Sequence, residues 1–278
     1  MPDFSPDAAL RCAASVRRNE PVSTGLIRLD LELEKAAPFQ PGQFAMVNLQ
    51  GHRAFTFGRP FSILEVDGPM LSLLYRVVGG GTRRMQELKA GETMDFLGPL
   101  GQPFAPPEEG RQTVLIGGGV GLPPIWAWYR AHGRGDDRAY FGGRDGGDVP
   151  WVLLDGHWRV SVDRQVDVPA EREAWEGLVP DLVARDIPAT DTAPRVVLAC
   201  GPIPLLRAAA ELAQARGWEC QVSLEEHMGC GYGACKGCVV PVHDAGRVRN
   251  ATCCQEGPVF AGEDIDWARY GRHDFEVV

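Results

Sequence analysis

The sequence predicts a chain of three domains that combines β and α/β folds. We expect an antiparallel β-barrel over residues 1–105, an α/β domain with a parallel sheet over 106–222, and a small cysteine-rich domain over 223–278. Short strands broken by turn residues fill the first part, and strands alternating with helices fill the second. Four closely spaced cysteines mark the third part. A chain of 278 residues is long enough for two or three separate cores.

The composition excludes several classes of protein. Hydrophobic residues make up 44% of the chain and charged residues 23%, as in ordinary globular domains. A net charge of −9 argues against a nucleic-acid partner. No apolar run reaches the ~18–20 residues that a membrane span needs, and the first residues lack the basic and apolar regions of a signal peptide. We therefore expect a cytoplasmic protein without a nucleic-acid or membrane partner.

The barrel is predicted from alternating apolar and polar residues. Residues 27–33 have the period of a half-buried strand, and residues 43–49 and 71–78 fit further strands. The pairs Pro41-Gly42 and Asp67-Gly68 are typical of turns. One helix is predicted from Thr82, as its N-cap, to Lys89, ending near Gly91.

The α/β domain is predicted from short apolar runs that alternate with helical patterns. Its strands are expected at residues 113–116, 139–141, 158–162 and 195–200. A helix follows the first strand and continues through Tyr129, and a second helix covers 205–216 with Gly217 as its stop. Residues 142–169 are irregular and receive no assignment.

Two turns in this domain are suited to a phosphate-containing ligand. Four glycines follow the first strand and open a helix, where backbone N–H groups can approach a pyrophosphate: Gly117, Gly118, Gly119 and Gly121. The next residues are Leu-Pro-Pro rather than the Gly-Lys-Ser/Thr of a P-loop, which argues against hydrolysis of a nucleoside triphosphate. The turn Cys200-Gly201-Pro202 follows another strand at the same expected sheet edge, so a dinucleotide site is favoured over a tight corner without a ligand.

The barrel carries a second candidate site. Arg59-Pro-Phe-Ser62 lies before an expected strand, and Leu74-Tyr75-Arg76 and Gly79-Gly-Gly-Thr82 follow later in the chain. The two arginines can pair with phosphate, Ser62 can hydrogen-bond a flavin ring, and Tyr75 can stack on it. On the residues alone, a purely structural role is equally consistent with this pattern.

The cysteine spacing predicts an iron–sulfur cluster. Cys230, Cys235 and Cys238 have the Cys-x4-Cys-x2-Cys spacing of plant-type [2Fe–2S] proteins, and the fourth ligand is Cys253 or Cys254. Glycines 229, 231, 233 and 237 lie between the thiols, where tight wrapping favours positive φ and brings amide N–H groups toward sulfur.

A Rieske centre, a zinc site and disulfides are the alternatives to this cluster. A Rieske centre needs two histidines, and only His227 adjoins the segment. Zinc is the alternative metal, although structural zinc usually takes two short Cys-x2-4-Cys knuckles. Clustered cysteines in a reducing compartment indicate metal ligands rather than disulfides, and Cys12, Cys200 and Cys220 are interpreted as small semi-buried hydrophobic residues.

The motifs together resemble the ferredoxin–NADP⁺ reductase superfamily. Within it, the chain is similar over about residues 10–265 to the electron-transfer subunits of NAD-dependent (class B) dihydroorotate dehydrogenases. The most specific likeness runs from Glu225 through the cysteines to the closing Cys-Gln-Glu-Gly-Pro-Val-Phe, and in that family the cysteine before x-x-Gly-Pro-Val-Phe is the ligand. The resemblance therefore selects Cys254 over Cys253.

The resemblance also implies the cofactors. It implies an FAD-binding barrel, an NAD-binding domain and a [2Fe–2S] domain. It assigns no catalytic residue to this chain, since no acid or base here needs to touch the substrate. The positions that match FAD-contacting motifs are Arg59, Pro60, Phe61, Ser62, Leu74, Tyr75, Arg76, Gly81 and Thr82. NAD is implied over NADP by the resemblance alone, because Arg144 is compatible with a 2′-phosphate. Residues 142–178 form a longer segment than the family pattern leads one to expect.

Two further functions remain alternatives. The implied function is an electron relay between NAD and an FMN-containing dihydroorotate dehydrogenase catalytic subunit, in a heterotetramer of pyrimidine (UMP) biosynthesis. The first alternative is an NAD(P)H-dependent reductase subunit that serves another flavoprotein or a ferredoxin. The second is a non-catalytic binding protein that zinc stabilises.

Overall fold

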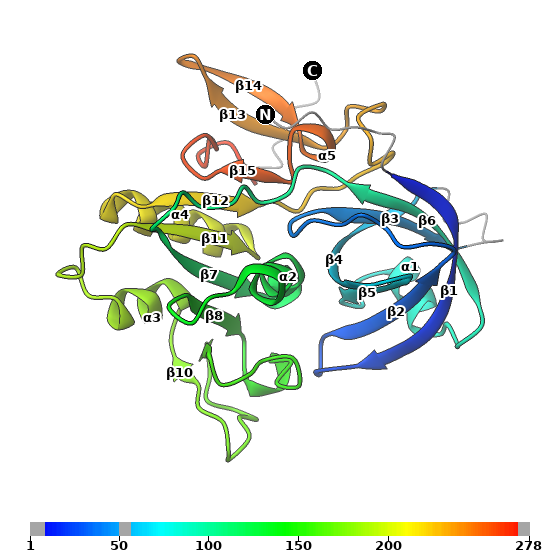
Figure 1. Ribbon diagram of the computed structural model, residues 1–278, viewed down its shortest axis with the longest axis horizontal. Coiled ribbons are helices and arrows are strands. Elements are labelled where there is room, and N and C mark those ends of the chain that lie inside the picture. The colour runs from blue at the N-terminus through cyan, green and yellow to red at the C-terminus, as the bar shows by residue number, and fades with distance from the viewer. Residues whose placement is uncertain (1–8, 50–56, 272–278) are drawn as a thin grey trace.

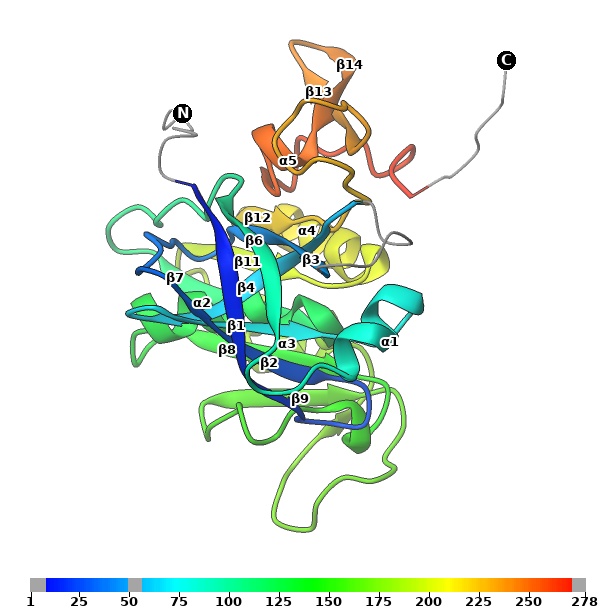
Figure 2. The same ribbon diagram turned by 90° about the vertical axis from the view of Figure 1, so that its right-hand side faces the viewer.

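The computed structural model describes residues 9–49 and 57–271 and confirms the expected fold class. In the described part of the chain, a closed barrel comes first, a seven-stranded sheet follows, and a two-stranded hairpin precedes the C-terminal turn. The barrel lies beside the sheet, and the hairpin projects from one end of the molecule (Figures 1 and 2).

The barrel closes in the strand order β1-β2-β5-β4-β3-β6. Its elements are β1 (Leu10–Pro21), β2 (Ile27–Leu33), β3 (Phe44–Leu49), β4 (Arg59–Asp67), β5 (Met70–Tyr75), α1 (Gly80–Gln86) and β6 (Thr93–Leu100). The alternation in β2 points Leu29 and Leu31 into the barrel core, where both are fully buried. The strand predicted over 27–33 is therefore confirmed.

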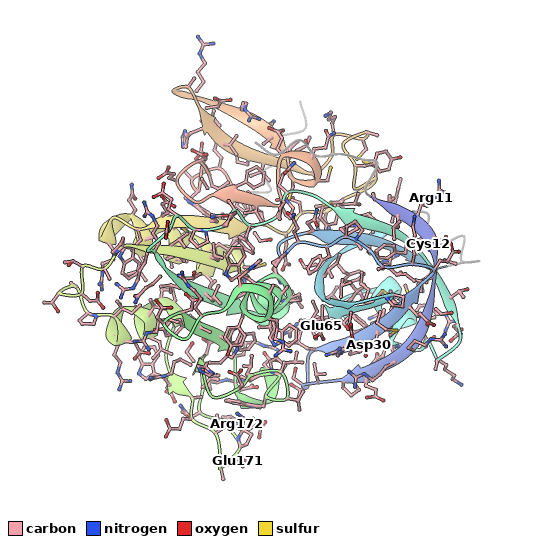
Figure 3. The ribbon with its side chains drawn as sticks, viewed as in Figure 1. Arg11, Cys12, Asp30, Glu65, Glu171 and Arg172 are labelled. Carbon is pink, nitrogen blue, oxygen red and sulfur yellow. The ribbon has the colours of Figure 1, made fainter. Side chains whose placement is uncertain are left out.

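The outer face of the barrel carries a polar network that joins three of its strands. Arg28 on β2 donates to Asp30 (2.7 Å) and to Glu65 on β4 (3.1 Å), and the Ser72 hydroxyl on β5 donates to Asp30 (2.7 Å). Figure 3 shows Asp30 and Glu65 close together on this side of the barrel. Partial burial by itself raises the pKa of Asp30, but the bonds from Ser72 and Arg28 outweigh it and lower the pKa.

Three sequence predictions in the barrel need correction. The strand predicted over 71–78 ends at Tyr75, because its partner β2 begins opposite that residue at Ile27. Residues 59–62 open β4 instead of preceding it. Thr82 is not the N-cap of α1: Gly79 occupies that position, and the Thr82 hydroxyl accepts from the backbone N–H of Gly79 (3.1 Å) from the third helical position.

The sheet has the order β10-β9-β8-β7-β11-β12-β15. Its strands are β7 (Gln112–Gly118), β8 (Arg138–Gly143), β9 (Trp158–Val162), β10 (Trp175–Glu176), β11 (Arg195–Cys200), β12 (Glu219–Ser223) and β15 (Val259–Ala261). All pairs from β10 to β12 are parallel, and only β15 runs antiparallel. The chain order reverses between β7 and β11, so the crevice between their carboxyl ends is the expected ligand position.

Helices cover both faces of this sheet. They are α2 (Leu122–His132), α3 (Val179–Asp186) and α4 (Ile203–Arg216), with short 3₁₀ turns at Gly119–Gly121 and Gly146–Asp148. Along β7, Leu115 packs with α2 on one face, whereas Val114 and Ile116 pack with α3 and α4 on the other. Helix α4 ends where predicted, at Gly217 with φ 64°.

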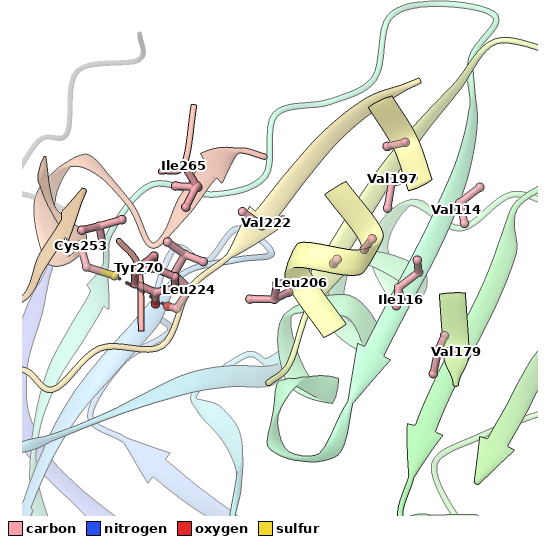
Figure 4. Close-up of a cluster of buried hydrophobic side chains, with 14 of the residues drawn as sticks. Val114, Ile116, Val179, Val197, Leu206, Val222, Leu224, Cys253, Ile265 and Tyr270 are labelled. Atoms are coloured by element: carbon pink, nitrogen blue, oxygen red, sulfur yellow. Dashed lines mark hydrogen bonds between the residues drawn. The ribbon is translucent and has the colours of Figure 1, made fainter. Parts of the chain in front are cut away.

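The C-terminal part continues the core of the sheet. The hairpin strands β13 (Val239–Asp244) and β14 (Arg247–Thr252) lead to α5 (Cys253–Glu256), and β15 then pairs with β12. Val222 on β12 shares one buried cluster with Cys253 and Ile265 (Figure 4). The cysteine-bearing segment is thus packed on the sheet through a common hydrophobic core.

Candidate functional site

The main candidate site is a cavity of about 620 Å³ between the barrel and the sheet. Val120 after β7 and Ile203 at the start of α4 line it from the sheet side, and Leu224 to Met228 line it from the segment that precedes the cysteines. All nine positions that match FAD-contacting motifs line the same cavity: Arg59, Pro60, Phe61, Ser62, Leu74, Tyr75, Arg76, Gly81 and Thr82. The cavity therefore touches all three parts of the chain.

One corner of this cavity is built by an arginine that lies over a glycine. A Cβ placed on Gly81 would come within 2.1–2.3 Å of the Arg59 guanidinium, so the guanidinium packs directly on the first turn of α1. The residues before it, Gly79 and Gly80, also carry no side chain and line the cavity. A guanidinium beside bare backbone is suited to an anionic group such as the pyrophosphate of a dinucleotide.

A second arginine of the cavity is held from the sheet side. Arg76 Nη1 lies 3.7 Å from Asp148 Oδ1, and Asp148 is buried. Arg144, after β8, also donates to Asp148 through two of its nitrogens. The hydrogen bond from Arg144 is the largest influence that lowers the pKa of Asp148, so this carboxylate stays ionised.

The other polar side chains of the barrel motif divide into two groups. Among the described residues, the Ser62 hydroxyl has no protein hydrogen-bond partner and is available to a ligand. The Thr82 hydroxyl is engaged by the backbone of Val78 and Gly79. Tyr75 is 1% exposed, donates to Asn19 Oδ1 (2.9 Å) and packs edge-on against Phe61, so it supports the wall of the cavity.

The two glycine turns of the α/β domain meet at the predicted sheet edge. Gly117 on β7 pairs in register with Cys200 on β11. A Cβ on Gly121 would lie 2.4 Å from the Cys200 carbonyl and the Gly201 nitrogen, and one on Gly201 would lie 3.2 Å from the Gly118 oxygen. Direct backbone contact between the turns thus explains why both lack side chains there, and Val120 and Ile203 from these turns reach the cavity.

The cysteine loop is wound tightly against the barrel. Gly231 and Gly233 have φ of 80° and 85°, as predicted, whereas Gly229 and Gly237 do not need positive φ. A Cβ on Gly231 would lie 2.4 Å from Met46 on β3, and one on Gly233 would lie 2.0 Å from Gln255 on α5. Side chains at these two positions would push the loop away from both neighbours.

The cysteine sulfurs are arranged in two pairs. The backbone N–H of Cys235 donates to Cys230 Sγ (3.4 Å), and the N–H of Cys254 donates to Cys238 Sγ (3.4 Å). Within each pair the two side chains also lie near enough to influence the pKa of one another. In the described residues, no group of three or more His, Cys, Asp or Glu side chains is spaced around one point. Two pairs fit a [2Fe–2S] unit, in which each iron takes two protein ligands, better than one zinc ion that takes four.

The environment of the first cysteine favours a thiolate. Burial by itself raises the pKa of Cys230, but backbone N–H groups of Cys235, Tyr232 and Ala234 and the Cys235 thiol outweigh it and lower the pKa to about 7. The amide of Gly233 points to Cys254. The predicted contact between amides and sulfur is therefore present in the loop, and it fits an anionic cluster.

Cys253 points away from these pairs. Its thiol donates to the carbonyl oxygen of Leu224 (3.7 Å), and the side chain is fully buried in the core beneath the loop. Cys254 lies beside Cys238 instead. This geometry supports Cys254 as the fourth ligand, which remains a prediction.

Sequence reasoning missed the segment that closes the cavity. Glu225, Glu226, His227 and Met228 belong to the stretch that carries the family likeness, but no site was assigned to them. The sequence feature that could have indicated a site is their position, directly after a strand of the parallel sheet and just before the first cysteine. Phe44 on β3 also lines the cavity and had no local signal at all.

The irregular segment forms a second cavity of about 590 Å³ that shares no lining residue with the first. Trp151, Trp158 and Arg172 are among its walls, and Arg172 lies over the Trp151 ring at 5.7 Å. Figure 3 shows Glu171 and Arg172 on a loop far from the barrel. The segment also supplies Asp148, so its first part reaches the main cavity while its later part does not.

None of the helices in the described residues has the length and apolar character needed to cross a membrane.

Comparisons with known proteins identify the kind of cysteine domain and the fold. Residues 225–266 match a family model described as the iron–sulfur cluster binding domain of dihydroorotate dehydrogenase B. The solved structure of an NADH-dependent reduced ferredoxin-NADP oxidoreductase superimposes with a TM-score of 0.75 at 22% identity and covers 92% of this chain and 90% of its own. The ferredoxin reductase of carbazole 1,9a-dioxygenase gives a TM-score of 0.65 at 22% identity, over 76% of this chain and 67% of the other. Both likenesses concern the fold.

Curated relatives extend the likeness to nearly the whole chain. The dihydroorotate dehydrogenase B (NAD⁺) electron transfer subunit of Caldanaerobacter subterraneus subsp. tengcongensis is 31% identical over 253 residues, which cover 91% of this chain and 97% of the relative. The subunit of the same name from Desulforamulus reducens is 33% identical over 82% of this chain and 87% of the relative. The chain belongs to the family of dihydroorotate dehydrogenase B (NAD⁺) electron transfer subunits.

Proposed function

We propose that this chain relays electrons between NAD and a dihydroorotate dehydrogenase catalytic subunit, by way of FAD and a [2Fe–2S] cluster, in pyrimidine biosynthesis. The observation that carries the proposal is the shared cavity. The barrel motif, the nucleotide turns and the segment leading to Cys230 all line one space. A flavin held there would lie between the dinucleotide edge of the sheet and the cysteine loop, which is the order that a relay needs.

Each cofactor has a set of residues suited to it. Arg59 and Arg76 would hold the FAD phosphates, and Ser62 would bond the flavin ring. The crevice at the two glycine turns would hold NAD. Cys230, Cys235, Cys238 and Cys254 would bind the cluster. FAD supplies the exchange between two-electron and one-electron chemistry when it is bound.

The protein contributes position and charge to this chemistry. Asp148 fixes Arg76 from the sheet side, and Gly81 lets Arg59 lie against α1. The cysteine loop packs on Met46 of β3, the strand whose Phe44 lines the cavity. The oxidation of dihydroorotate belongs to the partner, which we propose to be an FMN-containing catalytic subunit in a heterotetramer.

A cytoplasmic location is part of the proposal. The eight cysteines are free thiols. Free thiols of this kind persist in a reducing compartment such as the cytoplasm.

Reconstitution tests the relay. The purified chain should show flavin and iron–sulfur absorption, and with an FMN-containing dihydroorotate dehydrogenase subunit it should reduce NAD⁺ when dihydroorotate is added. A coloured chain that oxidises NADH but never responds to dihydroorotate would instead support a reductase subunit that serves another flavoprotein or a ferredoxin. A colourless zinc protein would refute the relay altogether.

A further inference from the structure

The carboxyl group of Glu225 faces the main cavity without a partner. Glu225 follows β12 and lines the cavity together with the barrel motif. The backbone around it is fixed, because Leu224 N–H donates to the Pro258 oxygen (2.9 Å) and the Tyr270 hydroxyl donates to the Glu225 oxygen (3.4 Å). Within the described residues, the Glu225 side chain itself makes no hydrogen bond or ion pair.

The surroundings of this carboxyl raise its pKa. Glu225 keeps exposed surface and lines the cavity, and the partial removal of its carboxyl from water within the fold raises the pKa. A carboxyl group with a raised pKa is better suited to exchanging a proton with a bound ligand than one at its ordinary value.

The proposed relay requires such a group. A bound flavin that takes single electrons from a cluster would receive no hydrogen nucleus with them. Hydride transfer to NAD⁺ would remove two electrons and one hydrogen nucleus from it. Each cycle therefore consumes one proton at the flavin, and the reverse cycle releases one.

We propose that Glu225 is the group that delivers this proton to the flavin and removes it again, an inference that rests on the proposed function. Glu225 lies five residues before Cys230 on one continuous segment. The proposed proton donor and the first cluster ligand thus lie on the same short segment.

Other titratable groups near Glu225 are less suited to the role. The Tyr270 hydroxyl bonds Glu226, and burial raises the pKa of Tyr270 far above neutral. Cys200, at the end of β11, is fully buried, and burial raises its pKa well above its ordinary value. The other titratable or charged residues that line the cavity are Arg59, Tyr75, Arg76, Glu226 and His227.

Separate half-reactions of the purified chain with its FAD and cluster test this assignment. In the first, NADH reduces the flavin anaerobically, and the hydride carries its own hydrogen nucleus. In the second, ferricyanide oxidises the reduced chain in weakly buffered solution, and a pH indicator follows the proton released. The variants are Glu225→Gln, Glu225→Asp and the exposed Glu263→Gln as the matched control.

The expected result is a selective effect. Glu225→Gln should slow proton release and the coupled flavin oxidation on the order of 10²-fold, while reduction by NADH keeps its rate. The pH dependence of the oxidation should vanish in Glu225→Gln, return in part in Glu225→Asp, and persist in Glu263→Gln. Flavin and iron–sulfur absorption of each variant confirms that it is folded and loaded.

Three results would overturn the assignment. Unchanged proton release in Glu225→Gln would do so, and so would an equal loss of both half-reactions in a fully loaded variant. A selective loss in Glu226→Gln would give the role to the neighbouring carboxyl. If the native chain binds neither flavin nor cluster, the proposed function fails and this inference fails with it.

Discussion

Arg76 of the barrel and Asp148 of the α/β domain lie 3.7 Å apart (Nη1 to Oδ1) at the edge of the main cavity. Gly25 makes room for this contact, because a Cβ there would come within 2.9 Å of both the Arg76 Nη1 and the Asp148 Oδ1 atoms. Asp148 also binds Arg144, which follows β8. One buried carboxylate therefore couples the barrel, the sheet and the cavity between them.

Asp148→Asn should weaken this coupling. Loss of the charge leaves Arg76 without its partner from the sheet side, and we expect a destabilisation of about 1–3 kcal/mol together with weaker FAD retention. Urea unfolding and FAD titration measure the two effects. The exposed Glu173→Gln in the same segment is the control, and an equal change in both variants would contradict the coupling.

The ionised Asp148 also predicts that the stability of the chain depends on pH. The pKa of Asp148 is lower in the folded chain than its unfolded value of about 3.9, chiefly because Arg144 hydrogen-bonds the carboxylate. Its contribution is therefore fully present above about pH 4 and is lost as the pH falls through the folded pKa. The difference in unfolding free energy between native chain and Asp148→Asn should be constant at neutral pH and shrink in acid.

Cys254→Ser should lose the cluster, and Cys253→Ser should keep it. The Cys254 backbone N–H donates to Cys238 Sγ, whereas the Cys253 thiol donates to the Leu224 carbonyl inside the core. Iron content and visible absorption distinguish the two variants. Cluster loss in Cys253→Ser with retention in Cys254→Ser would reverse the ligand assignment.

Gly121→Ala should destabilise the chain. The added methyl group would lie 2.4 Å from the backbone of Cys200 and Gly201, which cannot yield as a flexible side chain can. We expect a loss of about 1–3 kcal/mol and weaker NADH binding, because the two turns would separate. Gly117→Ala is the matched control, since its nearest contacts are at 3.5 Å, an ordinary packing distance. Thermal unfolding of both variants measures the effect.

Gly81→Ala should affect the cofactor more than the fold. Its methyl group would displace the Arg59 guanidinium, which is the far end of a flexible side chain. Loss of a charged contact worth about 1.5–3 kcal/mol would weaken FAD binding by roughly 10–100-fold. Gly79→Ala, with nothing within 4 Å of its Cβ, should weaken binding much less. Equal FAD affinities in the two variants would show that Arg59 is not a phosphate contact.

Local patterns predicted much of the fold and one site directly. The strands over Ile27–Leu33, Trp158–Val162 and Arg195–Cys200 have the predicted bounds, because alternation and apolar runs depend only on neighbouring residues. The stop of α4 at Gly217 likewise follows from one residue that adopts φ 64° without strain. The sequence patterns did not predict strand β1 or the hairpin of β13 and β14, because burial alternates only weakly along these strands.

The cysteine spacing and the glycine turns were determined by the sequence itself, because close spacing along the chain places their backbone atoms within reach of one ligand. Only the tertiary structure decided which distant segments meet. In the tertiary structure β15 pairs with β12, Asp148 lies beside Arg76, and Glu225 lines the cavity. These contacts join residues far apart in the chain, so they depend on how the sheet, the barrel and the shared core pack together, and no local pattern records that packing.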